Sequence, residues 1–146
     1  MVAGGTDSTA VLRAAIAHHQ AGSLEKARGL YEEALRSNPG DHAALHGLGV
    51  LLCSTGHVEA GVRHIRNAIQ IFPNFLDAHY NLGVVFQRHG QFAAALAHFD
   101  QALALAPGHF GAVISRASAL RSLGRHGRGG HEFAGRFARR NRAPSG

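Results

Sequence analysis

Histidine is the side chain in this sequence with the most obvious potential for chemistry, since 12 of the 146 residues are His. An imidazole transfers protons near neutral pH and is a common zinc ligand. His42 and His46 are four residues apart, which places them on one face of a helix, and His79 comes later in the chain. A zinc site needs three or four converging ligands, and no Cys or carboxylate joins these His at a recognisable spacing. We therefore expect no metal site and no cofactor.

The single cysteine, Cys53, precedes His57 by four residues. A nucleophile and its base also need a third group that orients the base, and the sequence offers none. We expect no catalytic residues and no enzymatic activity. A lone Cys cannot form an internal disulfide, no signal peptide is visible, and no apolar run approaches the roughly 20 residues of a spanning helix. These features predict a cytoplasmic protein without a membrane span.

Arginine is concentrated at the C-terminal end. Residues 116–146 contain eight Arg and one acidic residue, a net charge of +7, whereas residues 1–115 have a net charge of −1. Arg binds phosphates, and Phe133 and Phe137 are of the type that stacks on bases. An adaptor for nucleic acid or for an anionic membrane surface is therefore one alternative function. The arginines assigned to nucleic-acid contact are Arg128, Arg136, Arg139, Arg140 and Arg142.

A repeat of 34 residues positions these side chains. Glycines, prolines, small residues and bulky apolar residues all recur at this interval, and such self-similarity is the signature of a repeat architecture. The columns are Gly22, Gly56, Gly90 and Gly124; Pro39, Pro73 and Pro107; Ala34, Ala68 and Ala102; Ala27, Gly61, Ala95 and Gly129; and Tyr31, Ile65, Phe99 and Phe133. Each repeat contains two amphipathic segments, which the Gly separates and the Pro ends.

Three complete repeats are expected after a flexible leader at residues 1–7. They occupy residues 8–41, 42–75 and 76–109, and their apolar spacing predicts helices near 8–21, 24–37, 42–54, 58–71, 76–88 and 92–105. Asp7 or Ser8, and Asp41, are suited to cap the helices that follow them, because a side-chain oxygen at that position accepts a backbone N–H. The first three repeats therefore predict three antiparallel helix pairs.

A fourth repeat starts at residue 110 and keeps only its first half. Val113, Ala117 and Leu120 continue the inner stripe of a first helix, and Gly124 predicts the turn that follows it. The array is therefore expected to span residues 8–124.

The segment 125–146 departs from the repeat. Arg136 replaces the usual Ala, and the several Gly each cost about 1 kcal/mol relative to Ala in a helix. Phe133 nevertheless continues the apolar column of Tyr31, Ile65 and Phe99, and Phe137 continues that of Leu35, Ile69 and Leu103. This basic segment is either a weak terminal capping helix or a frayed end. An incomplete cap exposes apolar surface, so self-association through the C-terminal end is a further expectation.

The columns resemble those of the tetratricopeptide repeat over about residues 8–140. In the third repeat the signature positions of that family hold His79, Leu82, Gly83, Phe86, Gly90, Ala95, Phe99, Ala102 and Pro107, of which only His79 is atypical. The resemblance implies an all-α fold, a right-handed superhelical solenoid of antiparallel helix pairs. In that family the first helices line a concave groove, which suits an extended peptide or a partner helix.

The resemblance also assigns the groove to particular side chains of the first helices. The candidates are Leu12, Ile16, His46, Val50, Tyr80, Asn81, Val84, Gln87, Arg88 and Arg121. One subclass of the family grips the C-terminal carboxylate of chaperones with Lys/Arg and Asn. Only Asn81 fits that clamp here, and Asp77 would repel a carboxylate, so we expect no chaperone-tail clamp.

These features favour a non-enzymatic protein–protein interaction scaffold that binds an extended peptide or a partner helix in its concave groove. The second and third repeats also resemble those that precede bacterial glycosyltransferase or sulfotransferase domains. The alternative is therefore the standalone repeat region of a protein similar to an O-linked N-acetylglucosamine transferase or a sulfotransferase, which would serve substrate recognition. The 146 residues contain no catalytic domain of that kind.

Overall fold

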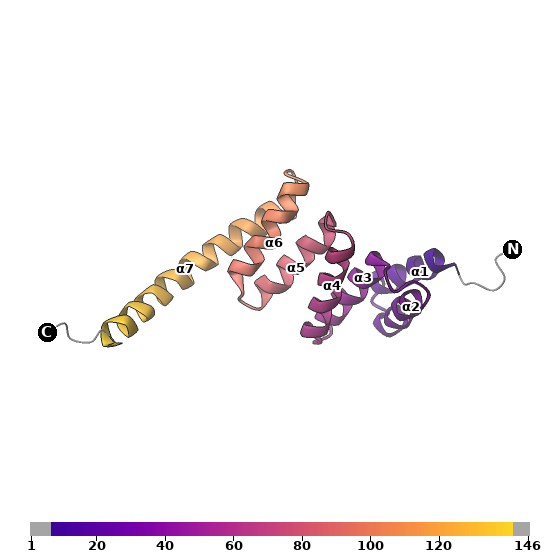
Figure 1. Cartoon of the computed structure of the whole chain (residues 1–146), viewed down its shortest axis with the longest axis horizontal. Helices are drawn as coiled ribbons and strands as arrows, with labels where there is room; N and C mark the ends of the chain where they lie inside the picture. The colour runs from indigo at the N-terminus through magenta and orange to yellow at the C-terminus, as the bar shows by residue number, and fades with distance from the viewer. Residues whose placement is uncertain (1–6, 142–146) are drawn as a thin grey trace. The chain divides into compact units, whose positions relative to one another are not determined.

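The computed structural model describes the backbone of residues 7–141 and the side chains of residues 7–125 (Figure 1). Over these residues the chain forms seven helices and no strand, which confirms the expected all-α class. The helices are α1 (Ser8–Gln20), α2 (Leu24–Ser37), α3 (His42–Ser54), α4 (Val58–Ile71), α5 (Leu76–Arg88), α6 (Phe92–Leu105) and α7 (Phe110–Asn141). The chain divides into two compact units, an N-terminal unit, Met1–Leu82, and a C-terminal unit, Gly83–Gly146.

Three of the repeated glycines end helices in the way their spacing predicts. Gly22, Gly56 and Gly90 have φ angles of 82°, 92° and 75°, a left-handed conformation that glycine adopts without a steric cost. At the first of these turns the Ser23 N–H donates to the His18 carbonyl at 2.8 Å, which is the hydrogen bond of a Schellman cap. The six helices predicted for the first three repeats are therefore confirmed, although α1 ends at Gln20, one residue earlier than expected.

Acidic side chains begin two of the first helices, as expected. Asp41 accepts hydrogen bonds from the backbone N–H groups of Ala43 and Ala44, both at 3.1 Å. Asp7 accepts one from Thr9 at 3.1 Å. These caps satisfy donors that have no partner inside the helix, and they fix where α3 and α1 begin.

The N-terminal unit is held together by close contacts of small residues with large ones. A Cβ at Gly47 of α3 would lie 2.6 Å from the Tyr31 ring, so only Gly leaves room for that buried side chain. A Cβ at Gly49 would lie 2.7 Å from the Gly61 carbonyl, so the backbones of α3 and α4 touch at this point. The columns of small residues are therefore the contact points between helices.

The C-terminal unit repeats this packing once more. A Cβ at Gly83 of α5 would lie 2.6 Å from the Phe99 ring of α6, which is fully buried. On its other side α6 packs against α7, where Ala112 and Ala119 are fully buried. The Arg116 side chain adds an ion pair to Asp100 across that contact, at 2.6 Å.

The prediction of a turn at Gly124 is wrong, because α7 continues from Phe110 to Asn141 as one unbroken helix (Figure 1). In the first three repeats the second residue after the Gly is apolar and begins the next helix, as Val58 does after Gly56. His126 takes that place after Gly124. A reversal of the chain is stabilised only if the second helix buries an apolar face, and a continued helix keeps its backbone hydrogen bonds instead.

The inner stripe predicted for the fourth repeat is also wrong. Val113, Ala117 and Leu120 are exposed, and the buried residues of α7 are Ala112 and Ala119. The predicted stripe faces the position that the second helix of a repeat would occupy, and α7 has no such partner among the described elements.

Several sequence predictions fall on residues whose side chains lie outside the described part of the chain. They concern Phe133, Phe137 and the nucleic-acid candidates Arg128, Arg136, Arg139, Arg140 and Arg142. Most of the predicted leader, residues 1–6, also lies outside it.

Candidate functional site

A polar pair links α3 to the first part of α5 in the N-terminal unit. The Asn81 Nδ2 donates a hydrogen bond to His46 Nε2 at 2.8 Å, and both side chains are partly buried. Burial lowers the pKa of His46, Asp77 opposes this effect by raising it, and His19 lowers it further. A neutral His46 with its proton on Nδ1 is the form that accepts the Asn81 hydrogen bond.

His19 on α1 is oriented by a second hydrogen bond. Its Nδ1 lies 3.0 Å from the Tyr31 hydroxyl, and the two rings meet edge to face at 5.8 Å. Burial raises the pKa of the Tyr31 hydroxyl and lowers the pKa of the His19 imidazole. When the Tyr31 hydroxyl donates to Nδ1, a neutral His19 carries its proton on Nε2.

Two Phe residues of the connection between α4 and α5 complete this face. The Phe75 ring lies 4.8 Å from that of His46 and 5.2 Å from that of His42, and Phe72 lies 5.0 Å from His42. Sequence reasoning missed both Phe residues because it considered only helix positions. The signal that could have found them is the pair of Phe that flanks Pro73 and Asn74. This pair directly precedes Leu76, the position one repeat after His42.

The other predicted groove residues differ in how far their side chains are exposed. In the N-terminal unit Leu12, Val50 and Tyr80 are partly buried and Ile16 is 38% exposed. Of the predicted set, the structure joins His46 to Asn81 by a direct hydrogen bond. In the C-terminal unit Val84 and Gln87 are partly buried, whereas Arg88 and Arg121 are exposed.

The His and Cys residues considered for metal binding and catalysis have structural contacts. His79 is buried and its Nε2 lies 2.8 Å from the Pro73 carbonyl, which explains how a His fills an apolar column. Cys53 Sγ donates to the Val58 carbonyl at 3.8 Å, and burial raises the pKa of its thiol, which disfavours the reactive thiolate. Within the described residues, no group of three His, Cys, Asp or Glu could hold a metal ion.

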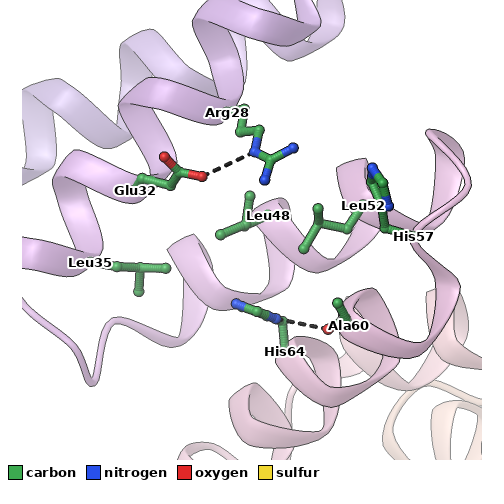
Figure 2. A pocket seen from close by; sticks show the side chains of 8 residues that line it. All are labelled: Arg28, Glu32, Leu35, Leu48, Leu52, His57, Ala60 and His64. Carbon is green, nitrogen blue, oxygen red and sulfur yellow. Dashed lines mark hydrogen bonds and ion pairs between the residues drawn. The ribbon is translucent and has the colours of Figure 1, made fainter.

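A shallow pocket lies between α2, α3 and α4 on the same unit (Figure 2). Its volume is about 430 Å³, and Leu48 and Leu52 form a largely buried floor. An ion pair between Arg28 and Glu32, with 3.0 Å between Nε and Oε1, lies at its edge. The full lining is Arg28, Glu32, Leu35, Leu48, Leu52, His57, Ala60 and His64. The charges at this edge neutralise each other, so the pocket has no strong preference for a charged ligand.

Two family models, both described as tetratricopeptide repeat, match the chain over residues 9–51 and 76–109. The chain belongs to the tetratricopeptide repeat family. This confirms the family that the 34-residue columns indicated, and the turns at Gly22, Gly56 and Gly90 show its helix–turn–helix units directly.

Known tetratricopeptide repeat proteins resemble parts of this chain. Human tetratricopeptide repeat protein 7A is 38% identical over 84 residues, which is 58% of this chain and 10% of that protein. An O-GlcNAc transferase mutant from Thermobaculum terrenum has a TM-score of 0.70 at 28% identity, over 80% of this chain and 23% of that one. The first repeat domain of Spaghetti, bound to an HSP90 peptide, has a TM-score of 0.76 at 12% identity, over 80% of this chain and 93% of that one.

The extent of these matches limits what they show. The chain spans about a tenth of the length of the human relative, and the similarity to the transferase is confined to its repeat region. The similarity to the Spaghetti domain shows the fold alone. None of the described helices is both long and apolar enough to cross a membrane.

Proposed function

We propose that the chain is a protein–protein interaction scaffold, and that a peptide segment of the partner binds the face formed by α1, α3 and the first part of α5. The observation that supports this best is the hydrogen bond between Asn81 and His46, which fixes the orientation of a partly buried amide. Because its Nδ2 is engaged, Asn81 presents its Oδ1 as an acceptor. Backbone N–H groups of an extended peptide match such an acceptor.

The polar groups on this face favour one kind of peptide. His19 Nε2–H supplies a donor for a peptide carbonyl, and Asp77 is an exposed carboxylate close enough to His46 to affect its pKa. A carboxylate repels the free C-terminus of a peptide and attracts Lys or Arg. The preferred ligand is therefore an internal segment with a basic residue beside Asp77. The predicted groove residues Val84, Gln87, Arg88 and Arg121 belong to the C-terminal unit and stay predictions.

The test begins with partners captured by the full-length chain from its native cells and identified by mass spectrometry. Peptides that tile a captured partner are then measured against the wild-type chain by fluorescence anisotropy. Asn81→Ala should weaken the best peptide about tenfold, because the loss of one hydrogen bond to a partly buried group costs about 1.4 kcal/mol. Asn67→Ala on the exposed side of α4 is the matched control. Equal binding by both variants would rule out this face.

A second candidate function rests on the similarity to the transferase structure. The chain would present substrates to a separate catalytic chain, as the repeat region of such an enzyme would. In this case the captured proteins should include a glycosyltransferase, and addition of the chain should raise the rate at which that enzyme modifies the other captured proteins. An unchanged rate would leave the scaffold function without this specialisation.

A further inference from the structure

The first part of α7 carries an apolar face that no other described element covers. Phe110, Val113, Ala117 and Leu120 recur at intervals of three or four residues, which places them along one side of the helix. We call these four residues the open face. All four are exposed, and Phe110 reaches 76%. Arrangements of this kind on a helix usually mark a contact with another element.

The equivalent face in the second repeat shows which kind of element packs against it. Leu45, Gly49 and Leu52 of α3 hold the positions of Val113, Ala117 and Leu120, two repeats earlier in the sequence. There α4 covers them, so that Leu45 is 7% exposed, whereas Val113 is 46% exposed. The occupant of this face in a complete repeat is therefore an antiparallel amphipathic helix.

The covering helices share a pattern of buried residues. Each brings a small residue, then a bulky apolar residue four positions later, then an Ala three positions after that. The three sets are Ala27, Tyr31 and Ala34 in α2; Gly61, Ile65 and Ala68 in α4; and Ala95, Phe99 and Ala102 in α6. A helix that covers α7 should carry the same pattern, since its small residue must approach Ala117 closely.

The chain's own C-terminal segment does not fit this pattern. In the same register it offers Gly129, Phe133 and Arg136. The third position is fully buried in all three complete repeats, where it is Ala34, Ala68 or Ala102. An Arg there would be buried without a defined partner, which is strongly unfavourable. Residues 126–141 also continue α7 as a helix, so they lead away from the open face.

The charge of α7 selects among the occupants that remain. Residues 110–125, the part of α7 whose side chains the structure describes, contain three Arg and no Asp or Glu. Arg116 is already paired with Asp100, whereas Arg121 and Arg125 are exposed and lie along one edge of the open face by helical spacing. Two copies of α7 packed against each other would bring these like charges together, whereas a helix with acidic flanks would pair with them.

We propose that the open face of α7 binds one amphipathic helix of an acidic partner protein, which takes the place that the second helix takes in the first three repeats. This interaction is independent of the peptide face on α1, α3 and α5. The partner helix carries the small, bulky and Ala pattern on one side and Asp or Glu along its edges.

The test uses a designed probe and the full-length chain. The probe is a labelled 14-residue peptide with the α4 sequence, Val58–Ile71, and three substitutions at positions outside the small, bulky and Ala pattern: Arg63→Glu, His64→Glu and Arg66→Glu. We expect saturable binding in fluorescence anisotropy. A second peptide with Lys at the same three positions should bind at least about tenfold more weakly, because it opposes the arginines of α7.

Variants of the chain test whether the probe binds at the open face. Leu120→Glu should abolish binding, since it puts a charge at the centre of the open face. Ile71→Glu, at a similarly exposed apolar residue of α4, should leave binding unchanged. Both residues are exposed, so circular dichroism should show the wild-type helix content for both variants.

Four results would overturn the proposal. One is the absence of probe binding, and another is equal binding of the acidic and basic peptides. A third is a dimer of the wild-type chain in sedimentation that Leu120→Glu converts to a monomer, which would identify a second copy as the occupant. The fourth is probe binding that appears only in a Phe133→Ser, Phe137→Ser variant, which would identify the chain's own C-terminal segment.

Discussion

Leu52 in α3 and Leu120 in α7 occupy the same position of the repeat, yet Leu52 is 6% exposed and Leu120 is 43% exposed. Both lie near the end of the segment that forms the first helix of a repeat. The difference arises later in the sequence, where Gly56 turns the chain back and Gly124 does not. Burial of a residue in this fold is therefore decided by the helix that follows it, and not by the helix that carries it.

The largest expected difference in stability comes from shortening the two Leu side chains to Ala. Leu52→Ala should lower the free energy of unfolding by about 3 kcal/mol, because it leaves a cavity in a packed core. Leu120→Ala should lower it by less than about 1 kcal/mol, since its side chain is already half solvated. Urea denaturation followed by circular dichroism measures both. Similar values for the two variants would mean that the face of α7 is covered in the free chain.

A smaller effect is expected at the small residue of the same face. Gly49→Ala should destabilise the chain by about 2 kcal/mol, although Ala favours a helix by about 1 kcal/mol over Gly. The added Cβ would meet the Gly61 carbonyl, and a backbone cannot move aside as a flexible side chain can. The converse change in the fourth repeat, Ala117→Gly, should cost only the difference in helix propensity. Denaturation midpoints would show whether Gly49 is needed for close packing.

The smallest effect concerns His46, whose place in the fourth repeat is taken by Ile114. The pKa of His46 in the folded chain lies below the 6.5 of an unfolded His, because burial disfavours its charged form. The folded state therefore binds fewer protons. Stability is complete above pH 6.5 and decreases as the pH falls through 6.5 towards the lower folded pKa.

His46→Gln should flatten this decrease in denaturation experiments between about pH 8 and about pH 5, since Gln does not titrate there. His57→Gln, at an exposed residue next to the turn at Gly56, is the control and should keep the wild-type profile. An NMR titration of the imidazole protons should also give His46 a pKa below 6.5. A value above 6.5 would show that the attraction of Asp77 outweighs burial.

Much of the fold could be predicted from the sequence because equivalent positions recur every 34 residues and can be compared between repeats. The turns at Gly22, Gly56 and Gly90 and the caps at Asp7 and Asp41 all depend on local residues. The failure at Gly124 has a physical reason. A Gly permits a left-handed turn but does not require one, and the apolar start of a second helix is what makes the reversal favourable.

The candidate site could be predicted only in part. His46 and Asn81 were both expected to face the groove, but their hydrogen bond joins different columns of neighbouring repeats, which a comparison within columns does not reveal. The contribution of Phe72 and Phe75 was not predictable from helix spacing, since it comes from a connection between helices. The identity of the bound peptide depends on contacts that one chain does not contain.

Under the proposed binding of a partner helix, the missing turn after Gly124 makes the covering of α7 depend on a second protein. In the first three repeats the covering helix is part of the same chain, so its effective concentration is high and constant, and those faces are always occupied. A partner helix that covers α7 must be supplied at its own cellular concentration. Occupancy of α7 would then follow the abundance of the partner, while the faces of the first three repeats stay covered.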